Sequence, residues 1–291
     1  MQDRGRRRSR LRPHLDPLGA IDLPDADDEP ASGRARFEAA LAVGAADGGR
    51  PGDAATLHAL ADAPVRKMAE LLYGSNAVFL LEMAADDPAG GGPMRAIYKP
   101  VRGERPLWDF PRHTLYLREV ATYLVDAALD LGHVPPTALR DGPLGPGSVQ
   151  LYIRSARRVP DTDRVEDVEE QLRDIAMLDV LVNNADRKHA HLLLGDDMRM
   201  RAIDNALTFL PYPRQRTALI SLGGSRLPDR ARQRLHELAS DERRVHELDV
   251  RLLRLLSQRE VAAFSARVSE LDADPTYPLL DDWDGRPFEW W

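Results

Sequence analysis

The alternation of apolar and polar positions divides the chain into a polar first part, a middle part with short apolar runs, and a last part with helical periodicity. Residues 1 to about 55 are rich in Arg, Asp, Pro, Gly and Ala, which is poor material for a hydrophobic core. We expect this region to be mostly disordered, with a short helix near residues 35–43. The ordered part is expected to begin near Thr56.

Three short apolar runs separated by turn residues predict three successive antiparallel strands. The first run has helical propensity, but strand, tight turn and strand fit it better because Gly74, Ser75 and Asn76 follow it directly. A second turn rich in Gly and Pro precedes the third run, which Pro100 ends. The expected strands cover residues 68–72, 77–82 and 95–99.

Helical periodicity begins at Thr114 and continues to Leu131, where Gly132 ends it. A short strand is expected over residues 148–153 and an amphipathic helix over 165–178. From Phe209 the chain looks helical to about Leu271. Within that stretch we expect Pro228 to begin a helix and Ser257 to form a capping box with Glu260.

This order of strands, helix, strand and further helices predicts an α+β fold with two lobes, rather than alternating βαβ units. We expect a small strand-rich N-lobe over about 56–150 and a helical C-lobe over about 151–272. Residues 1–55 and 273–291 are expected to be tails. The second tail is aromatic and acidic, and we expect it to pack on its own lobe, with docking on a protein partner as the alternative. Its aromatic residues are Trp283, Phe288, Trp290 and Trp291.

Composition narrows the classes of function. The 291 residues carry a formal net charge of −7, which argues against general nucleic-acid binding. There is no cysteine, so disulfides, thiolate metal sites and a cysteine nucleophile are excluded. No apolar run approaches the length of a membrane span, and no apolar segment follows the arginine-rich start as in a signal peptide. We therefore expect a cytoplasmic protein without an integral membrane segment.

Two aspartates stand eighteen positions apart, each in a distinctive phrase: Asp186 in LDVLVNNADR and Asp204 in RAIDNALTF. A lysine, Lys99, and a glutamate, Glu119, precede them in that order. Phosphoryl transfer from ATP needs such a set, because a lysine contacts the phosphates, one carboxylate orients the acceptor hydroxyl and another binds Mg²⁺. Each residue alone is a common surface or structural residue, but the ordered set favours a kinase-like nucleotide site.

The remaining parts of this site follow from position along the chain. Glu119 is expected to hold Lys99 by an ion pair. The turn of Gly74, Ser75 and Asn76 can place backbone N–H groups over the phosphates. The segment of Leu151, Tyr152 and Ile153 is expected to face the adenine as the linker between the lobes. Asp179 and Asn184 are expected to hold the catalytic loop by hydrogen bonds.

The two aspartate phrases resemble the catalytic and metal-binding segments of type II phosphatidylinositol 4-kinases and, more distantly, of HipA-type protein kinases. The chain also resembles an actinobacterial family of stand-alone phosphatidylinositol 3-/4-kinase-like proteins over about residues 60–260. The segments that carry these resemblances are NNADR at 183–187, AIDNALTF at 202–209, ATYLVD at 121–126, VPPT at 134–137, YKPVRGERPLWDFP at 98–111, DGPLGPG at 141–147 and VNNADRK at 182–188.

The resemblance implies a two-lobed protein-kinase-like or phosphatidylinositol-kinase-like fold. It also implies Lys99 as the ATP lysine, Asp186 as the catalytic aspartate and Asp204 as the metal aspartate. Arg187 and Lys188 join the candidate catalytic set as part of the same motif.

One departure from the family concerns the second metal position. Kinases usually have Asn five residues after the catalytic aspartate, and here that position is His191. An imidazole suits Zn²⁺ or Mn²⁺ better than Mg²⁺, so the cofactors expected are ATP with Mg²⁺ or Mn²⁺. The neighbouring His189 and His191 alone are weak support for a dedicated zinc site.

Three functions remain open at this point. The first is an ATP-dependent phosphotransferase acting on a soluble small molecule or a protein. A lipid acceptor is less favoured, because the type II lipid kinases use a cysteine-rich palmitoylated segment for membranes and this chain has no cysteine. The second is a catalytically weak or inactive nucleotide-binding regulatory module, a pseudokinase. The third is transfer of AMP instead of phosphate.

Overall fold

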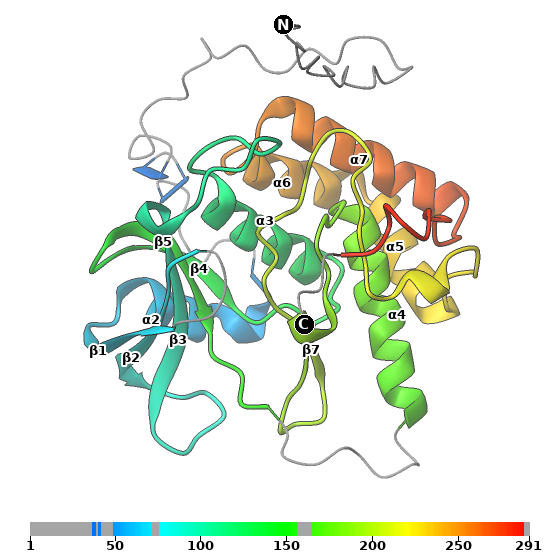
Figure 1. Cartoon of the computed structure of the whole chain (residues 1–291). Coiled ribbons are helices and arrows are strands. Elements are labelled where there is room, and N and C mark those ends of the chain that lie inside the picture. Colours follow the sequence, from blue (N-terminus) through cyan, green and yellow to red (C-terminus); the bar gives the residue numbers. More distant parts are fainter. Residues whose placement is uncertain (1–36, 39, 42–48, 72–75, 156–164, 288–291) are drawn as a thin grey trace, which may run out of the picture.

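The computed structural model describes residues 37–38, 40–41, 49–71, 76–155 and 165–287 (Figure 1). Most of the segment expected to be a disordered tail lies outside these ranges. Where residues 37–41 are described they are helical, and Phe37 is fully buried in the core.

Five antiparallel strands form one sheet in the order β1-β2-β3-β5-β4. The three successive strands predicted from the apolar runs are confirmed as β1, β2 and β3, and the strand predicted over 148–153 overlaps β5. β4 was not predicted, because it follows two prolines and its second half contains the polar residues Arg140 and Asp141. The strands are β1 (Val65–Leu71), β2 (Val78–Asp86), β3 (Pro93–Pro100), β4 (Thr137–Gly142) and β5 (Gly145–Leu151).

Two helices pack on this sheet. A 3-10 turn, η1 (Pro51–Asp53), leads into α2 (Ala54–Asp62), which contacts β4 and β5. The turn η2 (Val101–Gly103) follows β3, and α3 (Leu115–Ala128) then lies between the sheet and the helices of the second lobe (Figure 1). The predicted helix at 114–131 is confirmed as α3, whereas α2 was not predicted.

The second lobe is mainly helical. It contains α4 (Val165–Leu181), α5 (Asp229–Ala239), α6 (Glu242–Leu252) and α7 (Gln258–Ala273). A small hairpin of β6 (Leu192–Leu194) and β7 (Met200–Ala202) follows the turn η4 (His189–His191), and η5 (Ile220–Leu222) precedes α5. Both predicted helix starts are confirmed: Pro228 is the N-cap of α5, and Ser257 forms a capping box with Glu260 in α7.

The prediction of continuous helix after Phe209 is wrong for the stretch before Asp229. Apart from η5, this stretch is irregular. Pro211 and Pro213 lack the N–H that a helix interior requires. The backbone of Arg216 instead bonds the loop of the first aspartate phrase: its N–H donates to Asn184 O at 2.9 Å, and its carbonyl accepts from Arg187 N at 3.0 Å.

The described part of the C-terminal segment packs on its own lobe. Tyr277 N donates to Ser225 O at 2.9 Å, and Thr217 N donates to Gly285 O at 2.8 Å. Trp283 is 88% exposed, whereas Phe288, Trp290 and Trp291 lie outside the described residues. Among the helices that the structure describes, none has both the length and the apolar character needed to cross a bilayer.

One continuous hydrophobic core joins the two lobes, and a buried arginine lies at their junction. The guanidinium of Arg118 on α3 donates to the carboxylate of Glu260 on α7 and to the carbonyl of Thr208. Neither charged side chain is exposed appreciably. Burial opposes ionisation of Glu260, but the charge of Arg118 outweighs it and lowers the pKa of that carboxyl.

We expect Arg118→Ala to lower the free energy of unfolding by about 3–5 kcal/mol, because it leaves the Glu260 carboxylate buried without its cation. Urea denaturation measures this directly. Arg243→Ala is the control: within the described part of the chain the Arg243 side chain makes an exposed ion pair with Glu247 at 3.8 Å, so its loss should change the free energy of unfolding little. Equal effects of the two substitutions would contradict the role assigned to the buried pair.

Candidate active site

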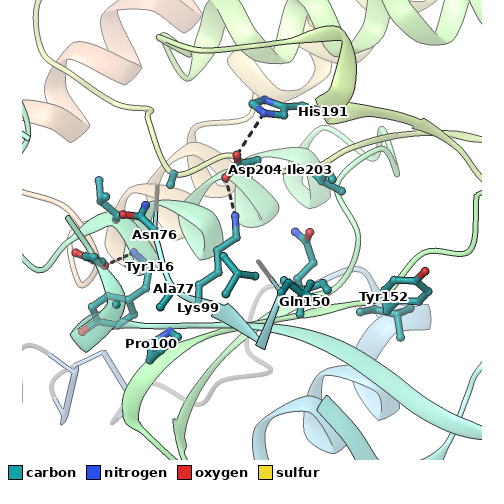
Figure 2. Close-up of a pocket in the computed structure, with 18 of the residues that line it drawn as sticks. Asn76, Ala77, Lys99, Pro100, Tyr116, Gln150, Tyr152, His191, Ile203 and Asp204 are labelled. Atoms are coloured by element: carbon teal, nitrogen blue, oxygen red, sulfur yellow. Dashed lines mark hydrogen bonds and ion pairs between the residues drawn. The ribbon is translucent and has the colours of Figure 1, made fainter. Parts of the chain in front are cut away.

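A cavity of about 300 Å³ lies between the sheet and the hairpin of the second lobe (Figure 2). Gln150 and Tyr152 lie at one end of the cavity, and Asn76 and Tyr116 at the other, with Lys99 between them. Asp204 and His191 face Lys99 from the second lobe. The structure therefore gathers residues from the third strand, the predicted linker and the second aspartate phrase around one space.

Lys99 on β3 lies between two carboxylates. Its Nζ donates to Glu119 on α3 and to Asp204 Oδ1, the latter at 2.7 Å. Burial opposes the charged form of Lys99, but the two carboxylates outweigh it and raise the pKa of Lys99 above its usual value. Lys99 thus remains a fixed positive charge at neutral pH, with its ammonium at the cavity wall.

Asp204 is the more open of the two carboxylates, with 49% of its side chain exposed against 2% for Glu119. The ammonium of Lys99 lowers the pKa of Asp204 well below its usual range and outweighs burial. The residue has φ +57°, a left-handed conformation that Asp tolerates better than most residues. An ionised, accessible carboxylate in the cavity is the expected form of a metal ligand.

His191 stands beside Asp204, with its Nε2 3.3 Å from Asp204 Oδ2. Burial lowers the pKa of His191, so the ring is neutral at neutral pH. Its Nδ1 accepts from Lys188 N at 3.4 Å, which leaves the proton on Nε2, facing the carboxylate. In this geometry His191 orients Asp204, and it can ligate a metal through Nε2 only after giving up the bond at Nδ1.

Asp186 lies close by in the loop after α4. Its Oδ2 pairs with Lys188 Nζ at 2.9 Å, and its backbone N–H donates to Asn184 Oδ1 at 3.0 Å. Burial raises the pKa of Asp186, and the ammonium of Lys188 partly opposes the rise. The side chain does not line the cavity itself, but the charge of Asp204 acts on it and contributes to the raised pKa.

The side chain of Arg187, the residue after Asp186, is fully buried. Two of its nitrogens bond Asp179, with Nε 2.9 Å from Oδ2 and Nη2 2.9 Å from Oδ1. Nη1 donates to Ile203 O at 2.8 Å, and Nη2 also donates to Asn205 Oδ1 at 2.6 Å. Arg187 therefore ties the two aspartate phrases together.

The structure shows the loop hydrogen bonds expected of Asp179 and Asn184. Asn184 Nδ2 donates to Asp179 Oδ1 at 2.9 Å, beside the bonds from Arg187. The preceding Asn183 has φ +51° and donates through Nδ2 to Leu210 O at 2.9 Å. These bonds hold the backbone on both sides of Asp186.

Asn205 and Glu104 contribute to the site and were not singled out from the sequence. The backbone N–H of Asn205 donates to Glu119 Oε2 at 3.0 Å, which connects the second aspartate phrase to α3. Glu104 lines the cavity near the start of α3. Both residues lie inside motifs that carry the family resemblance: Asn205 directly follows Asp204, and Glu104 follows Lys99 by five positions. Their position in these motifs is the sequence feature that could have identified them.

Of the predicted covering turn, only Asn76 is described, and Gly74 and Ser75 lie outside the described residues. Asn76 Oδ1 accepts from Arg105 N at 2.8 Å, and Ala77 N donates to Gly103 O at 3.1 Å. A Cβ at Gly103 would lie 2.8 Å from that of Ala77, so only glycine permits this approach. The end of the turn is therefore held against the segment after β3.

That segment continues into a contact between the lobes, which we call the clasp: Trp108 and Asp109 with Tyr212 and Arg214. Tyr212 Oη donates to Asp109 O at 3.3 Å, and Arg214 Nη2 lies 3.6 Å from Asp109 Oδ2. The Arg214 guanidinium also lies 5.5 Å from the ring centre of Trp108.

The predicted linker lies at the opposite end of the cavity. Leu151 ends β5, and Tyr152 and Ile153 follow it without regular structure; all three line the cavity. Tyr152 N donates to Arg95 O at 3.0 Å, and the Arg95 guanidinium lies over the Tyr152 ring at 4.8 Å.

We expect Asp204→Asn to reduce stability by about 1 kcal/mol at pH 7, because it removes the ion pair with Lys99 while keeping shape and left-handed backbone. The folded pKa of Asp204 is depressed, so its contribution is present above about pH 4 and is lost as the pH falls through the folded value. Urea denaturation from pH 8 to pH 3 should show the difference shrinking below about pH 4. Asp229 forms an exposed ion pair with Arg232, so the effect of Asp229→Asn on stability should not change in this way below about pH 4.

No protein-family model matches the chain. A crystal structure of the Golgi casein kinase with Mn/ADP bound is similar to it with a TM-score of 0.50 and 18% sequence identity, covering 75% of this chain and 74% of that one. The Helicobacter pylori proinflammatory kinase CtkA gives a TM-score of 0.45 and 9% identity, over 75% of this chain and 94% of that chain. The similarity to the Golgi casein kinase shows a kinase-like fold, as the residue set and the family resemblance predicted, and the α+β class agrees with the predicted order of elements.

The comparison of sequences gives a nearer relative. Protein Rv2133c of Mycobacterium tuberculosis is 31% identical over 268 residues, which cover 79% of this chain and 93% of the relative. This chain therefore belongs to the same protein family as Rv2133c.

Proposed function

We propose that the protein is an ATP-dependent phosphotransferase. The observation that carries the proposal is Lys99 held between Glu119 and Asp204 at the wall of a cavity between the lobes. This arrangement fixes one cation for the phosphates and one accessible carboxylate for a metal. The kinase-like fold supports the same class of reaction.

The nucleotide would span the cavity from end to end. We place the adenine against Leu151, Tyr152 and Ile153, and the phosphates beside Lys99, under the turn of Gly74, Ser75 and Asn76. The cavity of about 300 Å³ is at the lower limit of ligand pockets, so a nucleotide would fill it.

The residues fit a divalent metal that shares its coordination with phosphates. Among the described residues no three His, Asp or Glu side chains gather as a metal cage, so the protein alone would not hold the ion tightly. Mg²⁺ typically takes one or two carboxylates and completes its shell with phosphate and water. We assign Asp204 as the carboxylate ligand and His191 as the candidate second ligand; the bound metal would neutralise charge on the phosphates.

The Golgi casein kinase structure contains Mn and ADP. For this chain we propose ATP with Mg²⁺ or Mn²⁺, and the imidazole of His191 favours Mn²⁺.

In catalysis we assign to Asp186 the role of binding the acceptor hydroxyl. Its raised pKa makes its carboxylate a better hydrogen-bond acceptor than an ordinary aspartate, so it can orient the hydroxyl and receive its proton. Lys188 is paired with Asp186 and can place a positive charge near the transferring group. Arg187 is assigned a positioning role, because its hydrogen bonds fix both aspartate loops.

The finer parts of the proposal rest on the sequence, partly on the family resemblance and partly on composition and pattern. We propose that the chain is a stand-alone relative of phosphatidylinositol 3-/4-kinase-like proteins, with the kinase-like domain at 56–272 and cytoplasmic in location. The acceptor would be a soluble small molecule or a protein, and the C-terminal segment is a possible docking site for a protein partner.

A pseudokinase is the second candidate function. It is favoured by the Nε2–H of His191, which faces Asp204 where a metal ligand would need a free lone pair. Such a protein would bind ATP and regulate a partner without transferring phosphate.

The test incubates the protein with Mn²⁺ or Mg²⁺ and ATP labelled at the γ or the α position. We expect γ label on protein or in free phosphate, lost in Asp186→Ala, which should still bind nucleotide. Asp204→Ala should lose metal-dependent nucleotide binding as well, because its carboxylate is the open ligand. Transfer of α label would show AMP transfer instead.

Two outcomes separate the remaining alternatives. Binding of ATP without any turnover, in the presence of candidate acceptors, favours the pseudokinase. Turnover that is unchanged in Asp186→Ala would refute the role assigned to Asp186.

A further inference from the structure

One carboxylate oxygen of Glu104 accepts a hydrogen bond, and the other is buried without a hydrogen-bond partner. Oε1 accepts the backbone N–H of Tyr116 at 2.9 Å, in the first turn of α3. Oε2 is inaccessible to solvent and has no hydrogen-bond partner among the described residues. A buried carboxylate oxygen without a donor is costly, so this one calls for an explanation.

The position of Glu104 relates it to the ligand of the cavity. Its bond to Tyr116 places it at the Asn76 and Tyr116 end, opposite Gln150 and Tyr152 (Figure 2). If adenine occupies the Tyr152 end, the phosphates pass Lys99 and extend toward Glu104. Phosphate oxygens are anionic acceptors, so a carboxylate there repels them, whereas a carboxylic acid donates a hydrogen bond to them.

We propose that Glu104 binds the phosphate chain of ATP as a neutral acid: as the nucleotide enters, the side chain turns toward the cavity that it lines, and its protonated carboxyl donates a hydrogen bond to a phosphate oxygen. The proton comes from solvent as the nucleotide enters, and no covalent bond is made. The proposal rests on the proposed ATP site and goes beyond it, because it makes nucleotide binding a proton-uptake reaction.

The surroundings of Glu104 support the neutral form. Burial raises the pKa of Glu104 to about 7, although the backbone N–H groups of Tyr116 and Leu115 and the charge of Arg118 oppose the rise. The incoming phosphates raise it further. The other charged or titratable groups that line the same cavity are Lys99, Tyr116, Tyr152, Asp204 and His191, and a smaller adjoining cavity is lined by Arg105, Arg112 and His113. A substitution at Glu104 leaves all of these in place.

The test is calorimetric titration of the full chain with the non-hydrolysable analogue AMP-PNP and Mn²⁺, in two buffers of different ionisation enthalpy. Because burial raises the pKa of free Glu104 to about 7, we expect greater proton uptake at pH 7.5 than at pH 6, relative to Glu104→Gln. Subtracting the variant removes the protons of the analogue itself. Glu70→Gln, at an exposed acid of β1, should match the wild type.

Affinity gives a second measurement. Glu104→Gln keeps a donor at this position without a charge, so its affinity should equal that of the wild type at pH 6 and exceed it by about tenfold or more at pH 8.5. Glu104→Ala, which lacks the donor, should bind about tenfold more weakly than the wild type at pH 6.

The outcomes are distinguishable. Binding of AMP-PNP with equal proton uptake in the wild type and Glu104→Gln overturns the role of Glu104 but leaves the nucleotide site intact. Absence of AMP-PNP binding to the folded wild type overturns the proposed function and this inference with it. If Glu104→Gln does not fold, the wild type is compared with Glu104→Ala instead. A loss of AMP-PNP affinity between pH 6 and pH 8.5 that is no greater in the wild type than in Glu104→Ala contradicts the proposal.

Discussion

The buried guanidinium of Arg187 is the interaction on which the rest of the site depends. It satisfies Asp179 at the end of α4, the carbonyl of Ile203 and the amide oxygen of Asn205. Two loops that are eighteen residues apart are therefore held by one rigid group. A planar guanidinium suits this task because its donors have fixed directions, and a lysine could not make the same set of bonds.

A chain of hydrogen bonds connects Arg187 to the first lobe. Asn205 accepts from Arg187 with its side chain and donates to Glu119 with its backbone, and Glu119 in turn holds Lys99. The residue before Glu119 on α3 is Arg118, which faces α7 and bonds Glu260. Successive residues of one helix thus connect Lys99 on one side and the helical lobe on the other, so α3 cannot move without disturbing both.

The sequence predicted well what depends on local pattern and on residue type. Three strands, α3 and the capping box of α7 follow from periodicity and turn chemistry, and the structure brings Lys99, Glu119 and Asp204 together as their order along the chain suggested. The features that the sequence did not predict depend on contacts between residues far apart along the chain. The irregular stretch before α5 is set by bonds between Arg216 and the loop of Asp186, and the buried carboxylate oxygen of Glu104 results from packing that only the fold creates.

The clasp of Trp108, Asp109, Tyr212 and Arg214 is a second connection between the lobes, in addition to the chain segment that joins them after Leu151. Two bodies joined along one side open like a hinge, but two bodies joined on both sides open only when one side releases. The contacts of the clasp are long and partly exposed, so its release is easy compared with any change in the core. Separation of the lobes on this side would therefore begin with the release of a few surface side chains that do not line the cavity.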